Sequence, residues 1–430
     1  MKTRTLVCVA FALLLGLFAR VPVALAQTSG TVAVSPRRPL NEVIRLAHAG
    51  DAEAQFQLGS QYARGTYVAK NYQEALSWFR KAVAQGNAHA QNGLGAMYQE
   101  GWGVAQSYQQ AAAWYRKAAE QGDAVAQNNL GWLYQNGKGI VQDYTQAAAW
   151  YRKAAEQGNA LAQNSLGIMY EKGQGVAQDY TQAAAWYRKA AEQGNAVAQY
   201  AMGTVYFYGY GVPQDYTQAL NWYRKSAAQG NDKAQSMIGF MYDKGYGVAV
   251  DHEQANVWYL KSAQQGDAIS QKNLGVSYSH GEGVAQSNQQ AVFWWRKSAE
   301  QGNADAQVLL GAMYEKGQGG LTQDYTQAAA WYRKAAEQGD AVGQMSLGFM
   351  YDQGKGVPHD STQAVAWYRK AAEQGLPQAQ NNLGAMYQEG DGVPQDYDQA
   401  AYWFQKAAAQ GDANAQSSLK ALLRWERERQ

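Results

Sequence analysis

The sequence of 430 residues contains a single cysteine, Cys8, and only seven prolines. Cys8 lies within an N-terminal segment that we expect to be removed. The mature chain is therefore predicted to have no disulfide, no thiolate nucleophile and no cysteine metal site. Forty-five glycines beside so few prolines indicate glycine at regularly recurring turns.

An excess of charge of either sign is also missing, because 37 Lys and Arg residues stand against 35 Asp and Glu residues. Without Lys2, Arg4 and Arg20, which precede the expected cleavage point, the net charge is about −1. Nucleic-acid-binding proteins normally carry a basic stripe. The composition therefore argues against nucleic acid as a partner.

The first 26 residues have the pattern of a signal peptide. Lys2 and Arg4 precede an apolar run from Leu6 to Phe18, and a small-x-small pattern predicts cleavage after Ala26. The apolar run is shorter than the ~20 residues that a membrane span needs. We expect export to the periplasm or the medium without a stable membrane span. Residues 27–40 are polar and are expected to form a disordered lead-in.

No catalytic constellation is found. The glycine turns follow helices and not strands, so they are not nucleotide-binding loops. His280 with Glu282 is the one local pair of possible catalytic residues that we single out, and we interpret it as a loop feature without a catalytic role. We predict that the chain is not an enzyme and binds no metal or cofactor. The histidines are scattered without the spacing of a metal site, and they are His48, His89, His252, His280 and His359.

The rest of the chain repeats. The segment that begins at Gly122 returns at Gly158, after 36 residues, and such a period predicts a repeat architecture. The eighth unit carries one additional residue near Gly320 and Leu321. Ten units are predicted over residues 50–410, between an N-terminal capping helix at 41–49 and a C-terminal one at 411–430. The units start at Gly50, Gly86, Gly122, Gly158, Gly194, Gly230, Gly266, Gly302, Gly339 and Gly375.

Each unit has the pattern of two helices. An Asp or Asn after the starting glycine, such as Asp123, can accept the free N–H groups of the first turn. Apolar and small residues then recur at helical spacing from Ala124 to Tyr134. A Gly-x-Gly turn follows, as at residues 137–139, because glycine tolerates the positive φ at a helix end.

The second helix is predicted to start near Asp143, where Asp-x-x-Gln resembles a capping box. Its predicted buried face consists of Ala147, Trp150, Tyr151 and Ala154. Arg152 and Lys153, late in this helix, are interpreted as solvated. A single hairpin cannot bury both faces, so the units must stack and share one core. The predicted class is an all-α solenoid.

These features resemble a known family. The 36-residue period, Ala-x-x-x-Leu-Gly-x-x-Tyr in the first helix, the Gly-x-Gly-Val turn and Ala-x-x-Trp-Tyr-Arg-Lys-Ala-Ala in the second are similar to Sel1-like repeats, relatives of the tetratricopeptide repeat. The resemblance implies a right-handed superhelix of helix-turn-helix repeats that holds protein partners. Departures from the pattern are Tyr67 at the second turn glycine, Leu376-Pro377 at a helix cap, and His252, Asn288 and Ser361 at the turn tyrosine.

Positions that vary between units are candidates for the surface. Positions four, eight, eleven and fifteen, counted from the starting glycine, share one helix face, and this face is expected to line the concave side of the solenoid. Clustered aromatic residues on a surface commonly mark an interaction site. The alternative is that the residues at position eleven pack against the next unit. The candidate partner-binding residues are Trp132, Tyr200, Phe207, Tyr208, Tyr210, Met237, Phe240 and Tyr246.

A second candidate site is polar. Asparagines recur on the first helices and could grip the backbone of an extended peptide, but the simpler interpretation, which we favour, is that they are solvated helix residues. They are Asn92, Asn128, Asn129, Asn164, Asn381 and Asn382.

The sequence therefore predicts a non-enzymatic scaffold of the bacterial cell envelope or exterior, which holds a protein or peptide in its groove. A cell-wall enzyme is one possible kind of partner. Two alternatives stay open. The resemblance also extends to host-contact factors, including immunoglobulin binders, and exposed Trp and Tyr could stack on the sugar rings of peptidoglycan or another glycan.

Overall fold

The structure, a computed structural model, describes residues 38–429, and these form 22 α-helices and no strand. The all-α class is confirmed. The predicted signal peptide and residues 27–37 of the predicted lead-in lie outside the described residues. The first described helix is α2 (Leu40–His48), and the last is α23 (Ala413–Arg429). No helix of the described part combines the length and the apolar character that a bilayer span requires.

Twenty helices between α2 and α23 form ten hairpins, as the repeat pattern predicts. The first helices are α3 (Ala52–Arg64), α5 (Ala88–Glu100), α7 (Ala124–Asn136), α9 (Ala160–Lys172), α11 (Ala196–Tyr208), α13 (Asp232–Lys244), α15 (Ala268–His280), α17 (Ala304–Lys316), α19 (Ala341–Asp352) and α21 (Pro377–Glu389). The second helices are α4 (Tyr72–Ala84), α6 (Tyr108–Glu120), α8 (Tyr144–Glu156), α10 (Tyr180–Glu192), α12 (Tyr216–Ala228), α14 (His252–Gln264), α16 (Asn288–Glu300), α18 (Tyr325–Glu337), α20 (Ser361–Glu373) and α22 (Tyr397–Ala409).

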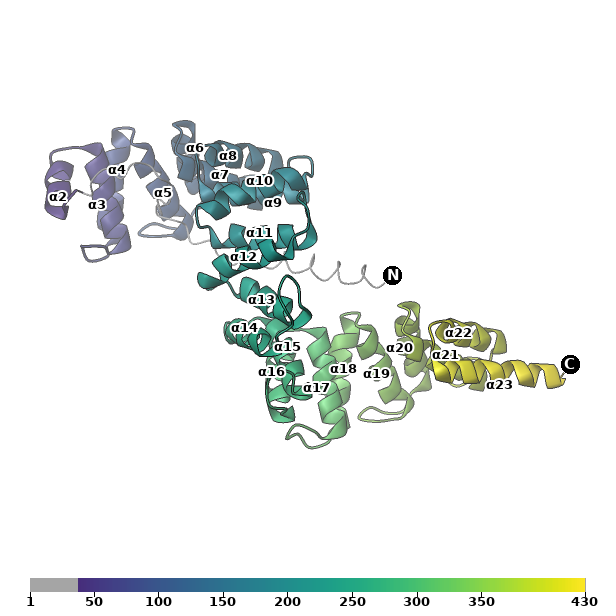
Figure 1. The fold of residues 1–430 in the computed structure, drawn as a ribbon. Helices are drawn as coiled ribbons and strands as arrows, with labels where there is room; N and C mark the ends of the chain where they lie inside the picture. The colour runs from purple at the N-terminus through teal and green to yellow at the C-terminus, as the bar shows by residue number, and fades with distance from the viewer. Residues whose placement is uncertain (1–37, 430) are drawn as a thin grey trace. The chain divides into compact units, whose positions relative to one another are not determined.

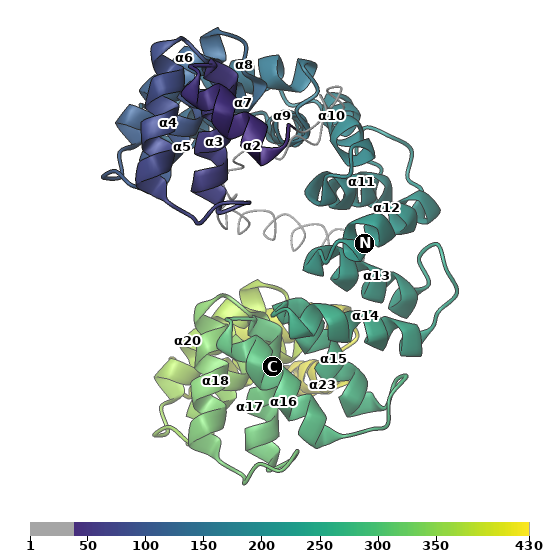
Figure 2. The same cartoon turned by 90° about the vertical axis from the view of Figure 1, so that its left-hand side faces the viewer.

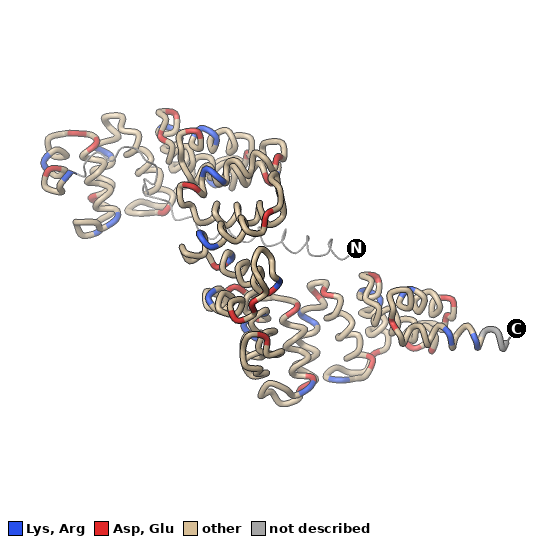
Figure 3. The backbone as a smooth tube through the Cα atoms, viewed as in Figure 1, with Lys and Arg blue, Asp and Glu red and all other residues tan. Residues whose placement is uncertain are grey.

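The chain divides into two compact units, one ending at Trp222 and the other beginning at Tyr223, within α12. In each unit the hairpins lie side by side in sequence order (Figures 1 and 2). Figure 3 shows Lys and Arg interspersed with Asp and Glu along both units. Each unit is therefore a stack of similar hairpins with mixed charge.

The predicted helix caps are formed. Asp123 Oδ1 accepts a hydrogen bond of 2.7 Å from the N–H of Ala126 at the start of α7. Asp143 caps α8 by accepting from the N–H groups of Thr145 and Gln146. Leu376 provides no side-chain cap for α21, where proline occupies the first turn. A proline there has no N–H that needs an acceptor.

The second turn glycine sets how closely successive hairpins approach. Gly139 has φ +71°, and a Cβ added to it would collide with the backbone of Tyr108, at the start of the preceding second helix. In the first repeat this place is taken by Tyr67, with φ 66° and 74% of its surface exposed. Because most of its surface is exposed, the side chain of Tyr67 has the room that a side chain at Gly139 would lack. The departure therefore has a steric reason.

Within each hairpin a large ring packs onto a small residue of the facing helix. Ala147, Tyr151 and Ala154 are buried, as predicted, and Tyr151 lies against Gly131, where an added Cβ would meet the ring at 2.9 Å. Trp150 is only half-buried, which differs from the prediction. The ammonium group of Lys153 lies 4.2 Å from the centre of its ring and covers the exposed side.

The Arg-Lys pairs near the end of the second helices were predicted to be solvated, but both residues make contacts within the protein. While Lys153 covers Trp150, Arg152 donates a hydrogen bond of 2.9 Å to the hydroxyl of Tyr170 in the following repeat. The same arginine–tyrosine bond recurs between other neighbouring repeats, for example from Arg116 to Tyr134. These cations therefore join successive hairpins.

A row of glutamines runs through the repeat junctions. Gln127 is only 4% exposed; its Nε2 donates to the carbonyl of Ala119 at 3.1 Å, and its Oε1 accepts from Nε2 of Gln157 at 2.8 Å. Equivalent pairs recur along both units, from Gln85 with Gln55 to Gln410 with Gln380. Each glutamine thus connects three helices, which fixes the register of one hairpin on the next.

Candidate protein-binding surface

A row of polar side chains crosses the first helices of the second, third and fourth repeats. Asn92, Asn128 and Asn164 lie on α5, α7 and α9 at position seven of their repeats, counted from the starting glycine, and each is 9% exposed. Tyr200, at the same position of the fifth repeat on α11, continues the row and is half-buried. We call these four residues, together with Asn129, the asparagine row. All five lie in the first unit.

Two amides of this row have buried oxygens without a partner. Nδ2 of Asn129 donates to Oδ1 of Asn92 at 3.1 Å, which links neighbouring first helices. Among the described residues, Oδ1 of Asn128 and Oδ1 of Asn164 are buried and accept no hydrogen bond. The interpretation of these residues as solvated is wrong for Asn92, Asn128 and Asn164. A buried polar atom left unpaired destabilises a fold by about 1–3 kcal/mol.

The repeat itself does not require asparagine at position seven. The same position holds Phe56 in the first repeat, Val308 in the eighth and Met345 in the ninth. An apolar side chain therefore fits this place in the chain's own architecture. Unpaired polar groups that the fold does not need are expected where they serve another purpose.

The two remaining candidate asparagines lie in the second unit. Asn381 and Asn382 are adjacent on α21 and half-buried, and Oδ1 of Asn381 is another buried oxygen without a partner. Position seven of the neighbouring repeats holds Met345 and Ser417, so these residues do not continue into a row.

The aromatic candidates of the first unit pack mostly against one another. Phe207 is only 7% exposed, so the expectation that it lies on the surface is wrong. Tyr208 and Tyr210 are half-buried and stack with ring centres 5.3 Å apart, and Tyr210 stacks on Tyr180 at 5.2 Å. Burial, followed by the charges of Tyr180 and Glu171, raises the pKa of Tyr210. These rings form a packed edge of the hairpins.

The other aromatic candidates are also half-buried. Trp132 packs against the cores of both the third and the fourth repeat, as the alternative interpretation anticipated. In the second unit, Phe240 and Tyr246 lie with ring centres 5.7 Å apart, and Met237 is half-buried on the same helix as Phe240. Variation in sequence identified these positions, but it does not distinguish exposed residues from residues that fill space between repeats.

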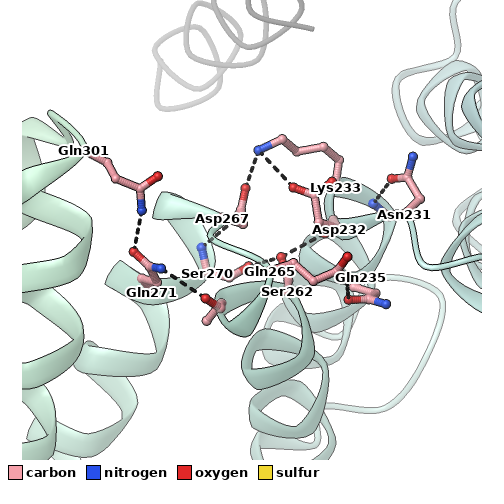
Figure 4. A network of polar contacts seen from close by, with 12 residues as sticks. Asn231, Asp232, Lys233, Gln235, Ser262, Gln265, Asp267, Ser270, Gln271 and Gln301 are labelled. Atoms are coloured by element: carbon pink, nitrogen blue, oxygen red, sulfur yellow. Dashed lines mark hydrogen bonds and ion pairs between the residues drawn. The ribbon is translucent and has the colours of Figure 1, made fainter. Parts of the chain in front are cut away.

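In other polar clusters the hydrogen-bonding groups are paired with one another. Figure 4 shows one between α13 and α16, in which Nζ of Lys233 reaches both Asp232 and Asp267. Oγ of Ser262 donates to the carbonyl of Asp232 at 2.8 Å and accepts from Ser270 at 2.9 Å. Such a network holds hairpins together, and its groups are paired within the protein.

Two histidines have carboxylate partners that their spacing did not reveal. Nδ1 of His89 lies 2.7 Å from Oδ2 of Asp123, and this hydrogen bond raises the pKa of His89. His252 lies beside Asp243 and Glu282, which come from two different repeats. The spacing of the histidines in the sequence did not indicate this grouping around His252. A linear sequence does not show contacts between neighbouring hairpins.

The inserted residue of the eighth repeat changes the surface locally. A shallow hollow of ≈ 450 Å³ lies beside Gly319 and Leu321, and its rim includes Phe293 and Lys297. Phe293 is exposed, but the ammonium group of Lys297 covers its ring at 4.7 Å. Because Lys297 already covers the exposed ring of Phe293, the hollow is a weaker candidate than the asparagine row.

Comparison with known proteins shows similarity to a repeat family and to solved structures of its members. The model of the Sel1 repeat matches ten consecutive segments: 52–87, 88–123, 124–159, 160–195, 196–231, 232–267, 268–303, 304–340, 341–376 and 377–412. A protective antigen of uropathogenic Escherichia coli with an SLR fold is 39% identical, with a TM-score of 0.63, and the match covers 90% of this chain and 91% of that one. A Sel1 repeat protein from Oxalobacter formigenes is 32% identical, with a TM-score of 0.55, over 81% and 90% of the two chains. No curated protein matches.

Proposed function

Because the chain belongs to the Sel1 repeat family, we propose that it is a scaffold that holds an extended segment of a partner protein along the asparagine row. Sel1 repeat proteins are generally protein-interaction scaffolds, and this fold is typically non-catalytic. The observation that carries the proposal is the pair of buried, unpartnered oxygens of Asn128 and Asn164 at positions where other repeats have apolar residues.

An amide row suits the backbone of an extended peptide. Neighbouring helices pack about 8–10 Å apart, and an extended chain advances about 3.3 Å per residue. One amide per repeat can therefore meet the peptide at about every third residue. Rotation about χ2 brings either the donor or the acceptor end of each asparagine outward, so that it can bond a peptide carbonyl or N–H. Backbone contacts of this kind hold a segment without fixing its sequence.

The test separates binding from stability. Peptides are selected against the purified protein from a random displayed library, and their affinity is measured by fluorescence anisotropy. Asn128→Val with Asn164→Val should weaken binding roughly tenfold or more, since two backbone contacts at ~1 kcal/mol each are lost. The same variant should melt at a higher temperature than the native protein, because two unpaired buried amides are replaced by apolar groups.

Asn381→Val is the matched control. It also removes a buried, unpartnered amide, but it lies outside the asparagine row. Its melting temperature should rise while its affinity for the selected peptides stays unchanged. Native affinity in the double variant would show that the row is not the site. A lower melting temperature of the double variant would show that these asparagines support the fold.

We also propose that the scaffold acts outside the cytoplasm. The signal-peptide pattern at 1–26 supports export, and so does the similarity to a protective antigen, since a protective antigen must be reached by the immune system. N-terminal sequencing of the protein recovered from periplasm or medium should give Gln27 as its first residue. An unprocessed chain that remains in the cytoplasm would contradict export.

A further inference from the structure

Three ligand-type side chains converge where the sixth repeat meets the seventh, within the second unit. They are Asp243 at the end of α13, His252 at the start of α14, and Glu282 in the turn after α15. One ligand atom from each lies within 4.8 Å of the other two. Asp243 is largely buried, with 18% of its side chain exposed, while His252 and Glu282 are 40% and 47% exposed. The cluster is therefore anchored in the fold and open to solvent.

The spacing suits a single metal ion. Ligands that lie about 2.0–2.2 Å from a tetrahedral centre are separated by about 3.3–3.6 Å. Oδ1 of Asp243 and Nδ1 of His252 are already 2.9 Å apart. This is the distance of a hydrogen bond, so these two atoms have to separate by about 0.4–0.7 Å to bind one ion, and the exposed side chain of Glu282 has to move toward them.

The other repeats show that the fold does not need these residue types here. The residue at the start of the second helix contacts the turn of the following repeat, and in other repeats this contact can involve an aromatic ring. Tyr72 stacks on Trp102 at 5.4 Å, and Lys138 lies over the ring of Tyr108. His252 and Glu282 occupy the equivalent positions, so an imidazole and a carboxylate replace a packing contact.

The third residue departs from the pattern as well. At the position of Asp243 several repeats carry a longer side chain, such as Gln135 or Glu171, which accepts a hydrogen bond from the hydroxyl of the buried tyrosine of the second helix, whereas the ninth repeat also carries an aspartate, Asp352. The shorter Asp243 turns one oxygen to His252, and its second oxygen pairs with Lys244 at 2.8 Å. A divalent ion would compete only with the hydrogen bond to His252, on the side of the carboxylate opposite the lysine.

A buried asparagine fixes the turn that carries Glu282. Asn256 lies one helical turn after His252, is 5% exposed, and its Nδ2 donates to the carbonyl of Glu282 at 2.6 Å. Equivalent positions hold Ala148 and Ala184, so this bond is specific to this junction. Oδ1 of Asn256 is buried without a partner. Nδ1 of His280 lies 3.8 Å from Oε1 of Glu282, and His280 is not one of the three residues whose ligand atoms converge.

From this convergence we infer that Asp243, His252 and Glu282 form a binding site for a divalent transition-metal cation of the zinc class. A set of one imidazole and two carboxylates suits zinc and its first-row neighbours better than magnesium, which demands an octahedral set of oxygens and water. The ion would link the ends of α13 and α14 to the turn of the seventh repeat. The inference is independent of the proposed peptide site, which lies in the first unit.

The test titrates Zn²⁺ into the purified protein in competition with a chromophoric chelator, with Mg²⁺ as the comparison. The native protein should take up one tight equivalent of Zn²⁺, and its melting temperature should rise saturably with Zn²⁺ but not with Mg²⁺. His252→Tyr and Glu282→Gln should each weaken Zn²⁺ binding roughly tenfold or more. Both variants introduce residues that the chain already uses at the equivalent positions, Tyr144 and Gln174.

His359→Gln is the control, because it removes an exposed histidine outside the cluster and restores the glutamine that other repeats carry there. It should bind Zn²⁺ like the native protein. Glu282→Gln changes an exposed residue and keeps the test valid if His252→Tyr fails to fold. The inference is overturned if the native protein binds no saturable equivalent, or if a folded His252→Tyr or Glu282→Gln protein binds Zn²⁺ as tightly as the native one.

Discussion

The glutamine row makes a quantitative prediction about what holds one hairpin on the next. Replacing Gln127 with alanine removes its bond to the carbonyl of Ala119 and its bond from Gln157. Each such bond stabilises a fold by about 1 kcal/mol net. The carbonyl of Ala119 keeps its bond from the N–H of Gly122, and exposed Gln157 can turn to water, so neither is left unpaired. We therefore expect Gln127→Ala to lower the free energy of unfolding by about 2 kcal/mol.

The chain supplies its own control at the last member of the row. Nε2 of Gln416 donates to the carbonyl of Ala408 through a long, exposed bond of 3.4 Å. An exposed bond of poor geometry contributes little, so Gln416→Ala should destabilise the protein by about 0.5 kcal/mol or less. The difference between the two variants measures burial and geometry, because the chemical change is the same.

Urea unfolding followed by helical circular dichroism gives the first comparison. A repeat stack need not unfold in one step, so hydrogen exchange in α6 to α9 should be measured as well. Gln127→Ala should speed exchange there and leave α18 to α22 unchanged. The reasoning is refuted if Gln127→Ala is no more destabilising than Gln416→Ala, since buried glutamines would then not carry the register of the stack.

Two further predictions concern the junctions between repeats. The pKa of His89 is raised in the folded protein, so its bond to Asp123 stabilises the protein fully below the unfolded pKa of about 6.5, and this stabilisation is lost as pH rises through the folded pKa. Between acidic and alkaline pH, the melting temperature of the native protein should therefore fall further than that of His89→Val. Equal decreases for the two proteins would contradict the pairing. Gly139→Ala combines positive-φ strain with a collision against Tyr108 and should destabilise by about 2–5 kcal/mol, whereas Gly137→Ala, which meets only Gln142, should be limited to about 1–2 kcal/mol. Similar urea midpoints for the two alanine variants would show that the hairpins can move apart at Gly139 without a further loss of stability.

The fold could be predicted from the sequence because every local signal is repeated. A single Asp at Asp123 or a single glycine at Gly137 would be weak evidence for a helix boundary. The same signals at a fixed period indicate ten equivalent hairpins, and the structure has them. Tyr67 was visible as a departure, but its reason was not, because the sequence does not show that a helix start faces the glycine in later repeats or that the side chain of Tyr67 is exposed.

The candidate site was predicted less well, and the reason is physical. Periodicity tells which residues share a helix face, but not how deeply a neighbouring hairpin covers that face. Phe207 was therefore placed on a surface although it is buried and packs on Tyr216 of its own hairpin, and Trp132 was a surface candidate although it packs against the cores of two neighbouring junctions. The contact between His252 and Glu282 joins two repeats, so no local spacing could reveal it.

The chain's departures from its own repeat fall into two kinds, and only one kind points to function. An aromatic or aliphatic departure such as Phe207 gains stability by filling space, so packing alone explains it. A buried polar atom without a partner lowers stability, as with Oδ1 of Asn128 and Asn164 in the first unit and Oδ1 of Asn256 in the second. Since other repeats hold apolar residues at the same positions, such as Val308 and Ala148, the fold does not explain the polar choice. In a repeat protein the other repeats thus act as an internal reference, and buried polar departures are the places where binding experiments should begin.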